Sequence, residues 1–392
     1  MKIYLFPFLI DLVMFLVMLR LADAAGREMK LSNLQISWLM VSFSAVYLVT
    51  CLFVGRLLHR GNARRIFVAS ICLLMGLAIP LFFANTFWMA WALFSLLGIA
   101  LALAFNSLQT FIRGEAPVGS LGLVISRYTV SWSLGVSCGF LFGGVLKDFG
   151  GPLALAGFTV GAGLTILLLV FTHKPTEHES SDAVVEEADA SNPRVSPVDA
   201  RYVVIGWLLC LVANFSQRPL TTFIPKFHAE NNSPAWLAGC LLFTLYFAQA
   251  ISGYACPRLR PWLYRRGPLL MVQLLIVVAL ACLWKAPNVL VSFGVLLLLG
   301  LLFGFVYFCC VYYVSNDARS SRNVGINEAM VGAGNILGML ISEWSMRIWN
   351  YPLAYFPVCM GLTLLLIGVQ WAWLNRQPTR KSLQEPESVA SV

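Results

Sequence analysis

The chain consists largely of apolar runs, each long enough to cross a membrane, and this feature constrains its fold more than any other. A transmembrane helix needs about 20 mostly apolar residues, and charged residues, proline or glycine separate one run from the next. Transmembrane strands are shorter and alternate apolar with polar residues, unlike these runs. We therefore predict an all-α integral membrane protein. The sequence predicts twelve helices, at residues 3–22, 34–58, 66–84, 87–112, 121–146, 152–171, 202–225, 235–257, 267–284, 289–314, 324–346 and 352–374.

The amino-acid composition supports a membrane protein. Hydrophobic residues make up 59% of the 392 residues and charged residues 11%, with a mean hydropathy of +0.78, whereas about a quarter of a soluble domain is charged. The net charge of +9 is spread over the turns rather than gathered in one basic patch, so we expect no nucleic-acid partner. The ten cysteines lie mostly inside apolar runs, without C-x-x-C spacing, and are interpreted as small apolar residues rather than disulfides or metal ligands.

One long polar segment, at residues 172–201, interrupts the apolar runs. It contains seven acidic residues together with serine and proline and has no apolar periodicity, which is typical of a disordered linker. Six runs fall on each side of this linker. We predict an N-terminal six-helix bundle at residues 1–171 and a C-terminal six-helix bundle at residues 202–376, followed by a tail at residues 377–392.

The distribution of lysine and arginine predicts the orientation in the membrane. If both termini are cytoplasmic, eighteen basic residues lie in the cytoplasmic segments and seven on the opposite side. Basic residues that flank a membrane helix resist translocation, so this orientation is preferred. We therefore predict a multi-pass protein of the plasma (inner) membrane, surrounded by the lipid bilayer, with the linker, the tail and both termini in the cytoplasm. The seven residues on the other side are Arg20, Arg27, Lys30, Lys147, Lys226, Lys285 and Arg347.

The turn between the second and third runs is strongly basic and reads Gly55-Arg56-Leu57-Leu58-His59-Arg60-Gly61-Asn62-Ala63-Arg64-Arg65. It resembles the loop between the second and third helices of the major facilitator superfamily, whose pattern is G-x-L-a-D-R-x-G-R-K. The matching positions are Gly55, Leu57, Arg60 and Arg64; the aspartate, the second glycine and the next arginine of the pattern are His59, Asn62 and Ala63 here. In that family the loop holds the cytoplasmic side shut, so the resemblance implies a gating loop at Gly55, Arg60 and Arg64. A basic loop that only sets the orientation is the alternative.

The two halves of the chain carry a similar glycine pattern. Gly135 and Gly139 in the fifth run and Gly334 and Gly338 in the eleventh occupy corresponding positions, each pair four residues apart. This spacing allows helices to pack backbone to backbone, and its recurrence is expected of a duplicated transporter with two pseudo-symmetric bundles. The first pair also resembles the family's fifth-helix pattern G-x-x-x-G-P-x-x-G-G, common among antiporters. Because Phe140 replaces its proline, the resemblance favours antiport only weakly.

Polar residues inside the apolar runs are concentrated in the first, fourth, seventh and tenth runs. These helices line the central cavity in the family, so the resemblance implies a substrate cavity here, although bonds to neighbouring helices explain some of these residues equally well. The third, sixth, ninth and twelfth runs hold almost no such residues and are expected to face lipid. The candidate cavity residues, which also include one residue of the fifth run, are Asp11, Asn106, Gln109, Arg127, Asn214, Gln217, Arg218, Tyr307 and Tyr312.

Four ionisable residues lie within the runs, namely Asp11, Arg127, Arg218 and Glu328. A charge there costs about 3 kcal/mol on insertion scales unless it is paired or hydrated, so such residues are functional candidates. Arg127 and Glu328 lie at nearly corresponding depths in the two halves and could form a salt bridge or bind substrate. Carboxylates can take up and release a proton, whereas arginine effectively cannot. Asp11, which has no basic neighbour one turn away, is therefore our first candidate for proton coupling, and Glu328 is its rival.

The resemblance to the major facilitator superfamily implies a secondary active transporter that works by alternating access. We predict that it moves a small polar or amphipathic molecule and that protons drive it, by symport or by antiport and efflux. A membrane sensor with a transporter fold, which binds a ligand without moving it, is the alternative. The sequence contains no phosphate-binding loop and no histidine cluster, so we expect a non-enzyme without catalytic residues, metal or cofactor. We expect it to function as a monomer.

Overall fold

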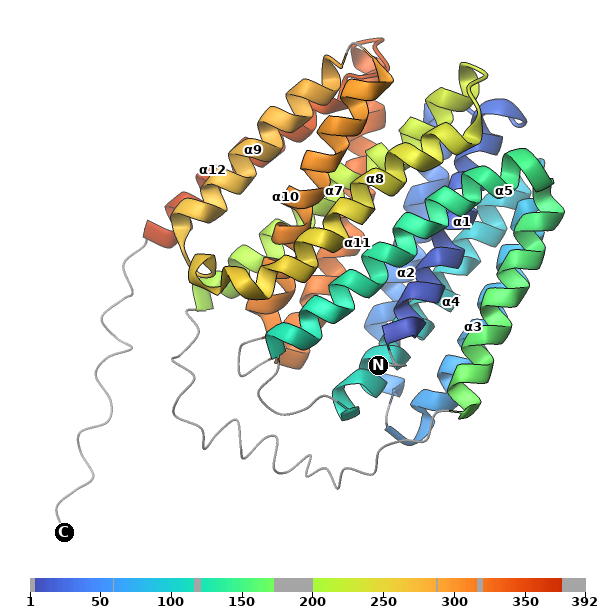
Figure 1. Cartoon of the computed structure of the whole chain (residues 1–392), viewed down its shortest axis with the longest axis horizontal. Coiled ribbons are helices and arrows are strands. Elements are labelled where there is room, and N and C mark those ends of the chain that lie inside the picture. The colour runs from blue at the N-terminus through green and yellow to red at the C-terminus, as the bar shows by residue number, and fades with distance from the viewer. Residues whose placement is uncertain are drawn as a thin grey trace.

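The computed structural model describes residues 4–58, 60–115, 121–172, 200–286, 288–315 and 320–375. These residues are almost entirely helical and contain no strand (Figure 1). The helices of the first half are α1 (Leu5–Arg27), α2 (Asn33–Leu57), α3 (Arg60–Phe82), α4 (Phe87–Glu115) and α5 (Leu121–Thr172). Those of the second half are α7 (Ala200–Glu230), α8 (Ala235–Ala255), the 3-10 helix η2 (Cys256–Trp262), α9 (Arg266–Trp284), α10 (Val289–Ser315), α11 (Ser320–Ile348) and α12 (Tyr355–Asn375).

The long α5 helix combines two of the predicted spans. Its 52 residues pass through Gly151, whose φ of 64° and ψ of −164° are not helical. Glycine adopts a positive φ without the steric cost that other residues meet. Pro152 follows, and proline is well tolerated in the first turn of a helix, where its missing N–H is not needed. The chain therefore turns back at Gly151 (Figure 1), and the described helices match all twelve predicted spans.

Length and composition qualify ten of the described helices to cross a membrane. The α11 helix is not among them, since it is more polar and carries Asn323, Asn327, Glu328 and Glu343. The prediction of an all-α membrane protein is confirmed. Most of the predicted linker and the predicted tail, at residues 173–199 and 377–392, lie outside the described residues.

The helices α1 to α5 lie on one side of the molecule and α7 to α12 on the other (Figure 1), and we call these two groups the N-terminal and the C-terminal bundle. Equivalent contacts close one end of each bundle. At the start of α3, Arg64 Nη2 donates to the Val170 carbonyl near the end of α5, at 3.0 Å. At the start of α9, Arg266 Nη2 donates to the Leu374 carbonyl near the end of α12, at 2.6 Å. Each arginine satisfies a carbonyl that has no partner within its own helix, and the third and sixth helices of each half pair in the same way.

The two glycine pairs also have equivalent neighbours. On α5, a Cβ atom at Gly139 would lie 2.6 Å from the Leu12 carbonyl oxygen of α1. On α11, a Cβ atom at Gly338 would lie 2.5 Å from the Phe215 carbonyl oxygen of α7. The other glycine of each pair meets the same helix one turn away. The predicted backbone-to-backbone packing is confirmed, and the first and fifth helices of the two halves pack alike.

The two bundles meet along α5 and α8, which run side by side through the middle of the molecule (Figure 1). Gly239 of α8 approaches the Phe140 carbonyl of α5 so closely that a Cβ atom would lie 2.6 Å from the oxygen. Further along the same pair of helices, Ser126 Oγ of α5 donates to the Gly253 carbonyl of α8 at 2.8 Å. Small residues therefore bring the backbones of opposite bundles into direct contact.

The α9 and α12 helices pack together and expose apolar side chains such as Val278, Leu365 and Trp371 on their outer surface. This agrees with the expectation that they face lipid. Each carries one glutamine, and the two are buried against each other, with Gln273 Nε2 donating to Gln370 Oε1 at 2.8 Å. The pairing follows from the membrane environment, because lipid offers no partner for an amide.

The packing of α5 on α1 predicts a difference between two glycines of the same helix. Gly139→Ala forces a methyl group against the α1 backbone, and such overpacking costs about 1–3 kcal/mol. Gly157→Ala is the control, since nothing lies within 4 Å of its Cβ position and alanine is the better helix former. We expect the first variant to lower the apparent melting temperature of the detergent-purified protein and the second to leave it equal or higher. Equal melting temperatures would contradict the tight contact.

Candidate functional site

A chain of hydrogen bonds crosses the interface between the bundles. The Tyr307 hydroxyl of α10 donates to Gln217 Oε1 of α7 at 3.0 Å, and Gln217 Nε2 donates to Gln249 Oε1 of α8 at 2.8 Å. Gln249 Nε2 then donates to Ser133 Oγ of α5 at 3.0 Å. All four side chains are buried. Because Ser133 belongs to the N-terminal bundle and the others to the C-terminal bundle, this polar chain joins the two halves in their interior.

Arg218, the next residue of α7, reaches into the N-terminal bundle and is only 6% exposed. Its Nη1 lies 3.0 Å from Met18 Sδ of α1, and its Nη2 lies 3.5 Å from Met40 Sδ of α2. The guanidinium carbon is 5.6 Å from the centre of the Phe43 ring. Its Nε has no hydrogen-bond partner. Thioether sulfur is a weak acceptor, so the buried positive charge is held by weak partners.

Asp11 of α1 is 7% exposed and faces the same region. Tyr246 of α8 lies within electrostatic range of both Asp11 and Arg218. The Tyr246 ring packs against Phe15, which follows Asp11 by one turn on α1, with ring centres 5.9 Å apart. An acidic group of one bundle and a basic group of the other therefore share a neighbour at the interface.

Glu328 of α11 is half-buried and accepts a hydrogen bond from the Tyr47 hydroxyl of α2 at 3.3 Å. This bond also joins the two bundles. Asp11 lies within electrostatic range of Glu328, so the two candidates for proton coupling occupy one interface. Arg127 of α5 is exposed, and the ion pairs of the described residues do not join it to Glu328.

Three of the other candidate cavity residues make contacts within their own helices. Asn106 Nδ2 donates to the Ala102 carbonyl of its own helix and to Cys51 Sγ of α2, and Asn214 donates to the carbonyl one turn earlier in α7. Tyr312 stacks on Phe308 of its own helix, with ring centres 5.7 Å apart. Gln109 lies on α4, but its side chain is outside the described part of the structure. Asn106 and Asn214 thus donate to carbonyls of their own helices, and Asn106 also bonds the neighbouring α2.

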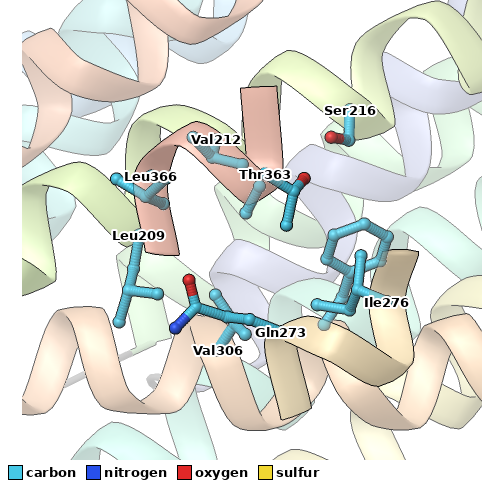
Figure 2. A pocket seen from close by; sticks show the side chains of 10 residues that line it. Leu209, Val212, Ser216, Gln273, Ile276, Val306, Thr363 and Leu366 are labelled. Atoms are coloured by element: carbon cyan, nitrogen blue, oxygen red, sulfur yellow. The ribbon is translucent and has the colours of Figure 1, made fainter. Parts of the chain in front are cut away.

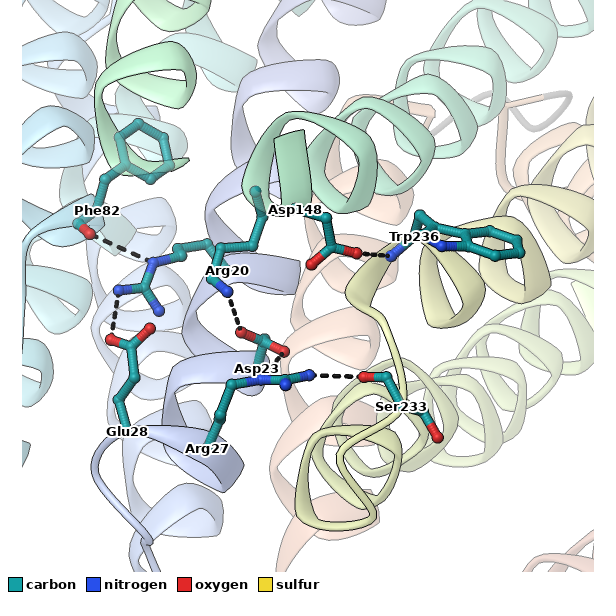
Figure 3. A network of polar contacts seen from close by, with 9 residues as sticks. Arg20, Asp23, Arg27, Glu28, Phe82, Asp148, Ser233 and Trp236 are labelled. Carbon is teal, nitrogen blue, oxygen red and sulfur yellow. Dashed lines mark hydrogen bonds and ion pairs between the residues drawn. The ribbon is translucent and has the colours of Figure 1, made fainter. Parts of the chain in front are cut away.

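A second polar network lies where α1 and α7 end and α8 begins (Figure 3). Lys147 Nζ of α5 lies 3.2 Å from Asp23 Oδ2 of α1. Arg27 Nη2 of α1 donates to the Ser233 carbonyl between α7 and α8 at 2.6 Å, and Asp148 Oδ2 of α5 accepts from the Trp236 backbone N–H of α8 at 2.9 Å. The contacts of Arg27 with Ser233 and of Asp148 with Trp236 run from the N-terminal bundle to the C-terminal bundle and can hold that end closed, whereas Lys147 and Asp23 pair within the N-terminal bundle.

The same network contains an ion pair within the N-terminal bundle (Figure 3). Arg20 Nη2 lies 2.7 Å from Glu28 Oε2, and Arg20 Nε donates to the Phe82 carbonyl at 3.3 Å. Sequence reasoning used the charges at the ends of these helices only to set the orientation. It missed their role as contacts, because a charge count does not show which helix ends meet.

The predicted gating loop is only partly described. Gly55 lies in the last turn of α2 and Arg60 is the first residue of α3, but the environment of both residues is outside the described part of the structure. His59 also lies outside the described residues. Arg64 binds the end of α5 within its own bundle. The role of Gly55, Arg60 and Arg64 as a gate therefore stays a prediction.

A small cavity lies inside the C-terminal bundle between α7, α9, α10 and α12 (Figure 2). It has room for no more than about one water molecule. Ser216, Gln273 and Thr363 contribute its polar atoms, and the rest of its wall is mainly apolar. In the part of the chain that the structure describes, no group of three or more His, Cys, Asp and Glu residues could hold a metal ion.

The sequence matches the family model of the Major Facilitator Superfamily over residues 3–323. The chain belongs to this superfamily. Among solved structures it is similar to the nucleoside transporter NupG, with 11% identity, a TM-score of 0.66 and coverage of 96% of this chain and 99% of the other. It is also similar to a D-xylose–proton symporter, with 13% identity, a TM-score of 0.73 and coverage of 95% of this chain and 96% of the other. At such identities the likeness shows the fold. No curated protein sequence matches the chain.

The central polar chain predicts an order of effects for two substitutions. Gln217→Leu removes the partners of both the Tyr307 hydroxyl and Gln249 Oε1, and each buried polar group left unsatisfied costs about 1–3 kcal/mol. Tyr307→Phe removes only the terminal donor. We expect Gln217→Leu to lower the apparent melting temperature of this superfamily member more than Tyr307→Phe does. The reverse order would show that the chain of bonds does not connect the bundles as described.

Proposed function

We propose that this protein is a secondary active transporter that moves a small polar or amphipathic molecule across the membrane in exchange for, or together with, protons. Membership of the superfamily supports secondary transport. The observation that carries the proposal is the set of buried polar side chains from both bundles that meet at their interface, namely Gln217, Arg218, Tyr307 and Asp11. Polar groups are costly inside a membrane protein, and they commonly mark a transport path.

Alternating access requires contacts between the bundles that can break and re-form. The contacts of Arg27 with Ser233 and of Asp148 with Trp236 fit this need on one side, because their polar groups can be hydrated when the bundles separate. The predicted gating loop would serve on the opposite side. We propose that these two regions open in turn while the α1–α5 and α7–α11 glycine contacts hold each bundle rigid.

We propose Asp11 as the proton-coupling group, with Glu328 as the rival. A coupling group must gain and lose a proton as the transporter changes state. Asp11 is buried and within electrostatic range of a second acid, Glu328, and two nearby carboxylates do not readily carry charge together. Glu328 accepts a hydrogen bond from Tyr47 that ties it to α2, whereas Asp11 makes no ion pair among the described residues, so we rank Asp11 first.

The proposed orientation, with both termini on the cytoplasmic side of the inner membrane, can be tested by cysteine labelling. In a variant without native cysteines, single cysteines at Lys30 and Ser233 should react with an impermeant thiol reagent in intact cells. Cysteines at Asn62 and Ser382 should react only after the cells are permeabilised. Labelling of Asn62 in intact cells would reverse the orientation.

The coupling proposal predicts that Asp11→Asn, which keeps the shape and removes the titration, abolishes accumulation of substrate against its gradient while downhill flux or exchange persists. The measurement is substrate uptake by proteoliposomes with an imposed pH difference, after a screen of nucleosides, sugars and organic acids. Glu328→Gln is the matched variant. If proteoliposomes with the Asp11→Asn variant still accumulate substrate, Asp11 is not the coupling group, and loss of accumulation in Glu328→Gln would assign that role to Glu328. If the wild type itself shows only downhill flux, the protein is a facilitator.

A sensor with a transporter fold is the second candidate function. It predicts saturable binding without flux for every compound that binds. Flux of any bound compound in proteoliposomes excludes it, whereas binding of several compounds with no uptake, exchange or downhill flux favours it.

A further inference from the structure

We infer that Arg218 is the binding group for an acidic substrate, and that the substrate is an organic monoanion with an apolar body. Its acidic group would pair with the guanidinium, and its apolar part would lie against Met18, Met40 and Phe43. This inference deepens the proposed function and rests on it, since it names the substrate class of the same central site.

The first argument is the contrast between Arg218 and the other buried cations. Among the described residues, Arg20 and Lys226 are also less than 5% exposed, and each contacts a carboxylate, of Glu28 and Glu230 respectively. Arg218 is equally enclosed, yet no ion pair joins it to a carboxylate of the described residues. Since arginine stays protonated, its charge remains uncompensated.

The second argument is the free energy of that arrangement. An unpaired charge in a low-dielectric interior is strongly unfavourable, and a bound anion with two parallel hydrogen bonds is the partner that a guanidinium fits best. Nε has no partner, and Nη1 and Nη2 contact only methionine sulfur. All three nitrogens therefore retain donors that a carboxylate could use.

The third argument concerns the rest of the ligand. The groups around the guanidinium are two flexible thioether side chains and one aromatic ring. Methionine adapts to apolar surfaces of different shape, which suits an apolar body beside the acidic group. The neighbouring amides of Gln217 and Gln249 already bond each other. One uncompensated positive charge among apolar groups favours a single negative charge over a dianion or a sugar.

The binding test uses the full chain, purified in detergent, and pairs of probes that differ only in charge. The pairs are acetate with acetamide, octanoate with octanamide, and benzoate with benzamide. We expect at least one acid to raise the apparent melting temperature by a few degrees while its amide does not, because a ligand that binds the folded state stabilises it. The shift should disappear in Arg218→Gln and persist in Lys226→Gln.

A second measurement separates a binding role from a structural one. Without ligand, Arg218→Met should raise the apparent melting temperature, because replacing an unpaired buried charge by an apolar side chain of similar volume removes an unfavourable term. Lys226→Met removes a paired cation and should not raise it. A merely structural Arg218 would give the opposite result, with a lower melting temperature for Arg218→Met.

The inference is overturned if Arg218→Met destabilises the ligand-free protein, or if no acid of the panel stabilises the wild type more than its amide. These outcomes are distinct from failure of the proposed function. An acid that binds through Arg218 without any flux in proteoliposomes refutes transport and leaves the inference standing. Flux of a neutral compound that is unaffected in Arg218→Gln refutes the inference and leaves transport standing.

Discussion

The inability of lipid to form hydrogen bonds governs this structure. A polar group within the membrane is stabilised only by a partner inside the protein, so the described spans are helices and many of their side-chain amides bind one another or backbone carbonyls. Gln273 meets Gln370 on two outward-facing helices, and Arg64 and Arg266 bind carbonyls at the ends of partner helices. Glycines supply the remaining stability by letting backbones approach, since apolar side chains gain little from leaving lipid for a helix interface.

The interface between the bundles meets this requirement least completely. The chain from Tyr307 to Ser133 is fully paired, but the adjacent Arg218 has only sulfur and an aromatic face as neighbours. This arrangement suits a binding site, because donors that lack strong partners in the free protein can form new hydrogen bonds with a ligand. In the alternating-access cycle that we propose, the same interface would also separate, and the bonds between the bundles would break and re-form in that step.

The fold was largely predictable from the sequence, whereas the site was predictable only in part. Run length predicts the helices because the bilayer fixes their length, and the repeated glycine pairs predict which surfaces pack. Polar residues within apolar runs pointed to Gln217, Arg218 and Tyr307, which meet at the interface. They also pointed to Asn106 and Asn214, whose amides donate to carbonyls of their own helices, since spacing does not show what a side chain contacts. Gln249 was missed although it is an amide within an apolar run, because the resemblance assigns the eighth helix no cavity role.

The α1 helix connects the parts of the molecule that the function needs. Asp11 is the candidate proton-coupling residue, and Met18, further along the helix, contacts Arg218. Asp23, near the end of the helix, belongs to the second polar network. At a rise of about 1.5 Å per residue, Asp11 and Asp23 are about 18 Å apart on one continuous helix. Close packing against α5 through glycines leaves this helix little freedom to bend. If Asp11 is the coupling group that we propose, a displacement of α1 together with its bundle would reach the contact with Arg218 and the contacts at the end of α1 as one rigid movement.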